Sequence, residues 1–198
     1  MDSYELLPHL DITPSGEICS KFLGMNIKTF QEACNYVHNL DYGYNSDTDD
    51  RWILFKELKG SCTPKHGVIA GLAEELQIPL YKNVGIYKFT EKIVKGAQKI
   101  IEKYKIPFIP MVHCFLEYNN YRFDLTEGND NGKETSIEEF MHKEQVEPFI
   151  SRKNEYLLYR RVLEEKLLLS PEFAGISLKI ILKAREEAIL LLHEKVKK

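Results

Sequence analysis

The stretch from Pro107 to Thr126, PFIPMVHCFLEYNNYRFDLT, decides the fold class. Its two halves are rich in apolar and aromatic residues, and Asn119-Asn120 between them fits a two-residue hairpin turn because asparagine tolerates positive φ. We therefore expect two antiparallel strands, 107–118 and 121–126, with Glu117 opposite Arg122. In that register His113 and Asp124 are diagonal neighbours on one face of the hairpin, within reach of each other's side chains.

Segments with helical spacing of apolar residues lie on both sides of this hairpin. Ser136 and Glu139 also have the spacing of a capping box, which predicts a further short helix after the hairpin. The order of these elements predicts an α+β fold with a small, mainly antiparallel sheet. The expected helices are 27–40, 65–76, 90–104, 155–169 and 178–197, and one more strand is expected at 83–89.

Length and charge limit the classes of protein that this chain can represent. Its 198 residues suit a single domain, 1–198, and its net charge of −3 argues against nucleic-acid binding and against a basic membrane face. No apolar run approaches the roughly 20 residues that span a bilayer. Residues Met1 to Glu5 show no charged-then-apolar leader, so we expect a cytoplasmic protein.

The four cysteines, Cys19, Cys34, Cys62 and Cys114, are irregularly spaced and fit free thiols in a reducing compartment. Cys34 lies on the apolar stripe of a helix and is interpreted as a core residue, as is Cys114. Cys62 is different, because it follows Gly60-Ser61 and precedes Pro64 at the start of a helix. The positive end of a helix dipole and its unpaired backbone N–H groups favour a thiolate and could also stabilise an oxyanion.

The hairpin supplies the partners that such a thiolate needs. His113 could exchange a proton with the thiol, and the carboxylate of Asp124 could hold the imidazole in the required tautomer. Cys62, His113 and Asp124 are therefore the candidate nucleophile, base and orienting residue of a catalytic triad. Glu117 and Arg122 are interpreted as an ordinary cross-strand ion pair.

Gly60-Ser61-Cys62, His113-Cys114-Phe115 and Asp124-Leu125-Thr126, in this order, resemble the motifs of the transglutaminase-like superfamily, a group of papain-like cysteine enzymes. The chain looks like a divergent, bacterial-type member. The resemblance covers about residues 40–127 and implies a core in which a helix that begins with the nucleophile packs against a sheet carrying histidine and aspartate. We expect this core at about 27–145, followed by a C-terminal helical extension at about 150–198.

The resemblance also implies roles for residues near the triad. Tyr42-Gly43-Tyr44 is similar to the aromatic stretch found upstream of the cysteine in such domains, which makes Tyr42 a candidate for oxyanion or substrate contact. His66 stands where many relatives carry a small residue. We interpret it either as a polar residue over the cleft, where it is a candidate for substrate or oxyanion contact, or as a residue behind the nucleophile. The expected substrate is a peptide or another amide, no cofactor is required, and either water or an amine could resolve a thioester intermediate.

Two other interpretations remain open. Cys62, His66, His113 and Cys114 have side chains that bind zinc, but the last two are adjacent on a strand and should point to opposite faces, so we predict no metal. A catalytically silent interaction domain of the same fold is the second alternative, and the apolar stripes of the C-terminal helices could then pack on a partner.

Overall fold

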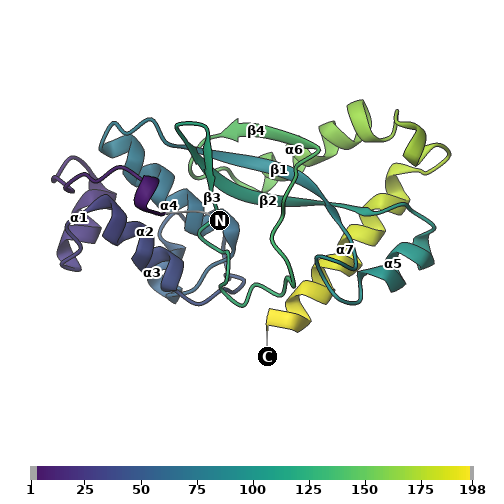
Figure 1. Cartoon of the computed structure of the whole chain (residues 1–198), viewed down its shortest axis with the longest axis horizontal. Coiled ribbons are helices and arrows are strands. Elements are labelled where there is room, and N and C mark those ends of the chain that lie inside the picture. The colour runs from purple at the N-terminus through teal and green to yellow at the C-terminus, as the bar shows by residue number, and fades with distance from the viewer. Residues whose placement is uncertain (1–3, 197–198) are drawn as a thin grey trace. The chain divides into compact units, whose positions relative to one another are not determined.

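The computed structural model describes residues 4–196 and confirms an α+β fold with a four-stranded antiparallel sheet in the order β3-β2-β1-β4 (Figure 1). A papain-like or transglutaminase-like core within this fold stays a prediction. In the described range no helix is long and apolar enough to cross a membrane. The helices are α1 (Glu17–Gly24), α2 (Phe30–Asn39), α3 (Ile53–Glu57), α4 (Cys62–Glu75), α5 (Ala97–Tyr104), α6 (Arg152–Val162) and α7 (Leu178–Val196), and the strands are β1 (Tyr81–Phe89), β2 (Ile109–Tyr118), β3 (Tyr121–Phe123) and β4 (His142–Val146).

The described chain groups into two compact units, each built from separate segments. The first contains residues 4–84, Cys114–Asn129 and Glu144–Ser151, and the second contains Gly85–His113, Asp130–Lys143 and residues 152–196. The boundaries fall within β1, β2 and β4. The predicted single domain, with its C-terminal extension, stays a prediction, and the two units are described in turn below.

Helix α4 forms the centre of the first unit, where α1, α2 and α3 all pack against it (Figure 1). It begins at Cys62, a few residues before the predicted range of 65–76, because Ser61 is extended and Pro64 fits the first turn of a helix, where no backbone N–H is needed. Every residue from Pro64 to Ala73 is buried. The apolar side chains of this core also come from β2, β3 and the segment after β3, through Leu116, Phe123 and Leu125.

Helix α1 was not expected from the sequence, and it depends on a distant side chain. The carboxylate of Glu75, at the end of α4, accepts hydrogen bonds from the backbone N–H groups of Ile18 at 3.0 Å and Cys19 at 2.7 Å. Gly16 precedes the helix, and a Cβ atom there would overlap the Glu75 carboxylate. The first turn of α1 is thus capped by a residue of another helix.

The hairpin between β2 and β3 has the predicted register. Glu117 is opposite Arg122, and Tyr118 is opposite Tyr121. Asn119 and Asn120 both have positive φ, 50° and 66°, as a primed two-residue turn requires. The second strand ends at Phe123 instead of continuing to residue 126, because the side chain of the next residue forms a local turn that replaces the ladder, as described below.

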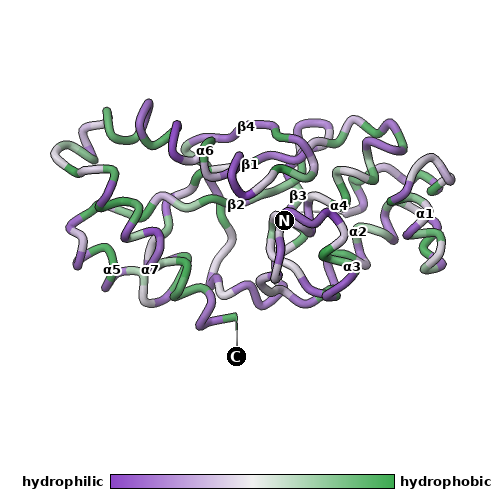
Figure 2. The backbone as a smooth tube through the Cα atoms, turned by 180° about the vertical axis from the view of Figure 1, so that it is seen from behind, coloured by the Kyte–Doolittle hydropathy of each residue, from purple (hydrophilic) through white to green (hydrophobic). Residues whose placement is uncertain are grey.

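In the second unit, α5 packs against α7 (Figure 1). The predicted helix from residue 178 is confirmed as α7 up to residue 196, and Lys197 lies outside the described residues. The apolar positions of α7 recur along the backbone in Figure 2, and its buried residues follow helical spacing. The helix expected from residue 90 begins only at Ala97. The carboxylate of Glu91 accepts hydrogen bonds from the N–H groups of Gly96 and Gln98, and Gly96 adopts φ 101°, so the segment before α5 is a capped turn. The buried residues of α7 are Ile181, Ala184, Ala188 and Leu192.

The short helix predicted from Ser136 is wrong. Residues 136–140 have no helical structure, and the following N–H, that of Met141, donates to the carbonyl of Ile86 at 2.8 Å. Phe140 packs where a Cβ atom on Gly85 would otherwise lie. Pairing with β1 therefore overrides the local capping pattern.

Candidate functional site

Cys62 is the cysteine that the fold leaves partly exposed. All four cysteines are free, but Cys19, Cys34 and Cys114 are completely buried. Cys62 is the first residue of the 14-residue α4, at the positive end of its dipole. This position at the start of α4 is an environment that favours the thiolate form of a cysteine.

Residues 41–44, which we call the two-tyrosine segment because they contain Tyr42 and Tyr44, lie next to the residues that precede Cys62. The two stretches of backbone are paired, since the N–H of Gly60 donates to the carbonyl of Asp41 at 3.0 Å. The rings of Tyr42 and Tyr44 contact each other edge to face with centroids 6.1 Å apart. Burial raises the pKa of the Tyr44 phenol, the charge of the Cys62 sulfur adds to the rise, and a hydrogen bond with Tyr42 lowers it.

These contacts place Tyr44 in the electrostatic field of Cys62, with Tyr42 next to it. Of these two tyrosines only Tyr42 is a predicted contact residue, although both belong to the same three-residue motif. Direct contact of Tyr42 with a substrate or an oxyanion stays a prediction.

Asp124 follows β3 and is almost completely buried. Its Oδ1 atom accepts two hydrogen bonds from Thr126, one from the backbone N–H at 2.9 Å and one from the hydroxyl at 2.7 Å. The Asp-x-Thr motif is therefore a self-contained turn that fixes the orientation of the carboxylate. Nε2 of His66 lies 3.4 Å from the same oxygen.

His66 joins the first turn of α4 to the segment after β3. Its Nε2 atom accepts a hydrogen bond from the backbone N–H of Leu125 at 2.8 Å, so the ring proton is assigned to Nδ1. Nδ1 then donates to the carbonyl oxygen of Cys62, also at 2.8 Å. The His66 side chain has no exposed surface, and a contact of His66 with a substrate or an oxyanion stays a prediction.

Two buried lysines near the start of α4 were not predicted from the sequence. Nζ of Lys82 donates to the carbonyls of Thr63 at 3.1 Å and Pro148 at 2.9 Å. Lys65 is also fully buried. A signal for Lys65 was present, because it lies three and four residues before Val68 and Ile69, on the face of the helix that points into the core.

His113 belongs to the second unit, where it is buried and its ring lies 6.4 Å from that of Tyr87, edge to face. Its neighbour Cys114 belongs to the first unit, and the Cys114 sulfur lies 3.5 Å from the hydroxyl oxygen of Thr63 in the first turn of α4. The pairing of His113 with Cys62 and Asp124 stays a prediction.

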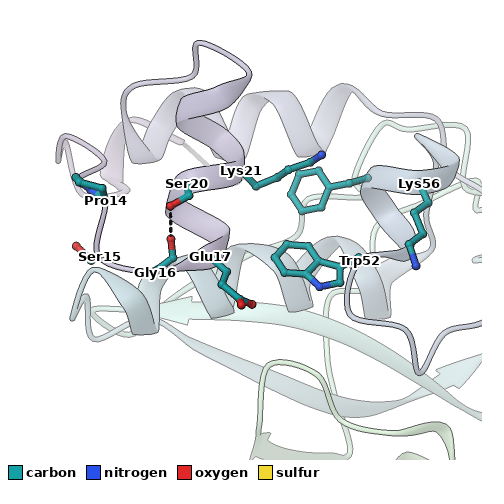
Figure 3. Close-up of a pocket in the computed structure, with 9 residues that line it drawn as sticks. Pro14, Ser15, Gly16, Glu17, Ser20, Lys21, Trp52 and Lys56 are labelled. Atoms are coloured by element: carbon teal, nitrogen blue, oxygen red, sulfur yellow. Dashed lines mark hydrogen bonds between the residues drawn. The ribbon is translucent and has the colours of Figure 1, made fainter.

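The first unit also contains an open cavity of about 810 Å³ along α1 and α3 (Figure 3). The rings of Trp52 and Phe55 line it with centroids 6.0 Å apart, and the ammonium of Lys21 lies 5.6 Å from the centre of the Phe55 ring. None of the proposed triad residues lines this cavity. Within the described residues, no group of three or more histidine, cysteine or acidic side chains could hold a metal ion.

Comparisons with known protein families, with curated proteins and with solved structures found no match to this chain.

Proposed function

We propose that this protein is a transglutaminase-like cysteine enzyme, an amide hydrolase or acyltransferase, with Cys62 as nucleophile, His113 as base and acid, and Asp124 as orienting residue. The observation that carries the proposal is the position of Cys62, a partly exposed thiol at the first residue of a long, buried helix. The free state of all four cysteines also fits the reducing cytoplasm, where we place the enzyme.

The reaction would start with attack of the Cys62 sulfur on the carbonyl carbon of a peptide or another amide. His113 accepts the thiol proton and returns it to the nitrogen as the carbon–nitrogen bond breaks, which releases ammonia or an amine and leaves a thioester. Water then attacks the thioester, giving a carboxylic acid and restoring the thiol. An amine in place of water would give a new amide.

Three features of the first unit support these roles. The positive end of the α4 dipole is suited to stabilising both an anionic sulfur and the oxyanion of the intermediate. Thr126 holds the Asp124 carboxylate in one orientation through two hydrogen bonds. Tyr44 lies close enough to Cys62 to respond to its charge.

The pH dependence of alkylation tests the activation of Cys62. With iodoacetamide and mass-spectrometric mapping, we expect Cys62 to react almost as fast at pH 6.5 as at pH 8.5, because an activated thiol is already ionised. In His113→Ala the rate should fall more steeply between these two pH values, and the limit is the roughly fifty-fold fall of a thiol with an ordinary pKa of about 8.5. His9→Ala, a change in an exposed histidine whose ring bonds the side chain of Gln31, should keep the wild-type profile.

Trapping with hydroxylamine tests the chemistry. A glutamine peptide incubated with the protein and hydroxylamine should give a hydroxamate, because hydroxylamine captures the thioester, and Cys62→Ala should give none. A fifty-fold fall in the alkylation rate of wild-type Cys62 between pH 8.5 and pH 6.5 would contradict an activated thiol. That result, together with no hydroxamate from a panel of amides, would favour a catalytically silent interaction domain of the same fold.

A further inference from the structure

The side chain of Lys65 is fully buried in the first unit, and all three ammonium protons have an acceptor. Nζ donates to the backbone carbonyl of His38 at 3.0 Å, to that of Leu40, and to the side-chain oxygen of Asn129. A buried cation is stable only when such partners replace its hydration shell. The three acceptors come from two segments that are far from Lys65 in the sequence.

The first segment is the end of α2 and the chain that follows it. His38 and Leu40 lie at the C-terminus of α2, where carbonyl groups have no partner within the helix and the helix dipole is negative. The Lys65 ammonium satisfies two of these carbonyls. Leu40 leads directly into Tyr42 and Tyr44, so the same contact anchors the two-tyrosine segment beside Cys62.

The second segment is the chain after β3, which begins with Asp124 and reaches Asn129. Nζ of Lys65 holds its far end through Asn129, while His66 holds its near end through the N–H of Leu125. Lys65 and His66 are adjacent in α4, one turn after Cys62. One turn of helix is therefore bonded to both segments that surround the start of α4.

We propose that Lys65 is a positioning residue, whose ammonium fixes the two-tyrosine segment and the Asp124 segment relative to the Cys62 thiol. This inference rests on the proposed function for its effect on Cys62 reactivity. The hydrogen bonds by which Lys65 holds the two segments can be tested without the proposed function. Burial lowers the pKa of Lys65 to about 8, and the charges of Asp41 and Asp124 oppose the fall, so the ammonium predominates at pH 7.

Hydrogen exchange at pH 7 in Lys65→Met tests whether Lys65 holds the two segments, because methionine fills a similar volume without any N–H donor. We expect protection of the amides in 38–44 and 125–131 to fall by roughly ten-fold or more, as the loss of charge-assisted hydrogen bonds predicts. Lys82→Met is the matched control, since it also removes a buried ammonium but one bonded to Thr63 and Pro148. That variant should instead lose protection around 146–150 and keep it in the two segments.

Asn129→Ala provides a milder second variant if Lys65→Met does not fold, and it should loosen 125–131 while leaving 38–44 protected. Unchanged protection of both segments in Lys65→Met, or of 125–131 in Asn129→Ala, would overturn the inference.

The alkylation rate of Cys62 at pH 6.5 is the second measurement, and it should fall roughly ten-fold in Lys65→Met. If wild-type Cys62 is not activated, the proposed function fails while the exchange result still decides the role of Lys65. If wild-type Cys62 is activated, and Lys65→Met loses protection of the two segments without any change in the alkylation rate of Cys62, the inference is also overturned.

Discussion

Nε2 of His66 accepts a hydrogen bond from the backbone N–H of Leu125, and this contact connects the helix of the candidate nucleophile to the segment of the candidate orienting carboxylate. The nitrogen that faces Asp124 is thus occupied as an acceptor, and its partner nitrogen donates to the Cys62 carbonyl. We conclude that a buried imidazole, bonded through both ring nitrogens, joins the start of α4 to the segment after β3.

Replacing His66 with leucine should destabilise the protein by about 2–4 kcal/mol, because the N–H of Leu125 and the carbonyl of Cys62 would lose their partner. Urea denaturation gives this difference, and His9→Leu at an exposed position should stay within about 0.5 kcal/mol of wild type. Nitrogen-15 NMR of the wild-type ring should show the Nδ1–H tautomer. An Nε2–H tautomer would contradict the assigned hydrogen bonds.

Glu75→Gln should lower the free energy of unfolding by about 1–3 kcal/mol, since a neutral amide oxygen replaces the carboxylate that caps α1. The neighbouring Glu74→Gln, at an exposed position, is the matched control and should have little effect. Burial and Glu75 raise the pKa of Cys19 to about 11, so removing the charge should also speed the alkylation of Cys19. Equal stabilities of the two variants would argue against the cap.

Two substitutions in the hairpin turn should change the free energy of unfolding in opposite directions. Asn120→Gly should stabilise the protein by roughly 0.5–1 kcal/mol, because glycine adopts the observed φ of 66° more easily, whereas Asn120→Ala should destabilise it by about 1 kcal/mol. Thermal unfolding of both variants measures the difference. The same sign for both would mean that the turn has another conformation.

Lys65 should make the stability depend on pH in the alkaline range. Its pKa is about 8 in the folded protein against an ordinary value of 10.5, so the unfolded chain binds more protons between these values and this group's contribution to stability rises with pH. The free energy of unfolding of wild type relative to Lys65→Met should therefore increase by roughly 2 kcal/mol from pH 7 to pH 9.5. Urea titrations of both proteins provide this comparison, and a constant difference would contradict the depressed pKa.

Elements whose determinants are local could be predicted from the sequence. The hairpin register followed from Asn119-Asn120 and the flanking strands, and the start of α4 followed from Ser61 and Pro64. The failed predictions depended on partners far away along the chain. The pairing of Met141 with Ile86 replaced the expected helix, and the polar sequence of β4 gave no alternating apolar signal.

In the candidate site, too, features with local determinants were predicted and features that depend on distant partners were not. The distinct position of Cys62 was predicted because a helix start depends on neighbouring residues. The carboxylate turn formed by Asp124 and Thr126 is also local. The burial of Lys65 and His66 was not predicted, because it depends on acceptors and donors supplied by α2 and by the segment after β3.

The cap that Glu75 places on α1 also sets an order of events during synthesis. At about 5–20 residues per second, the ribosome adds Glu75 roughly 3 to 11 seconds after Cys19, which leaves α1 without its cap for that time. An uncapped helix of eight residues is too short to persist alone in water. Helix α1 is therefore expected to form only after α4 has been made.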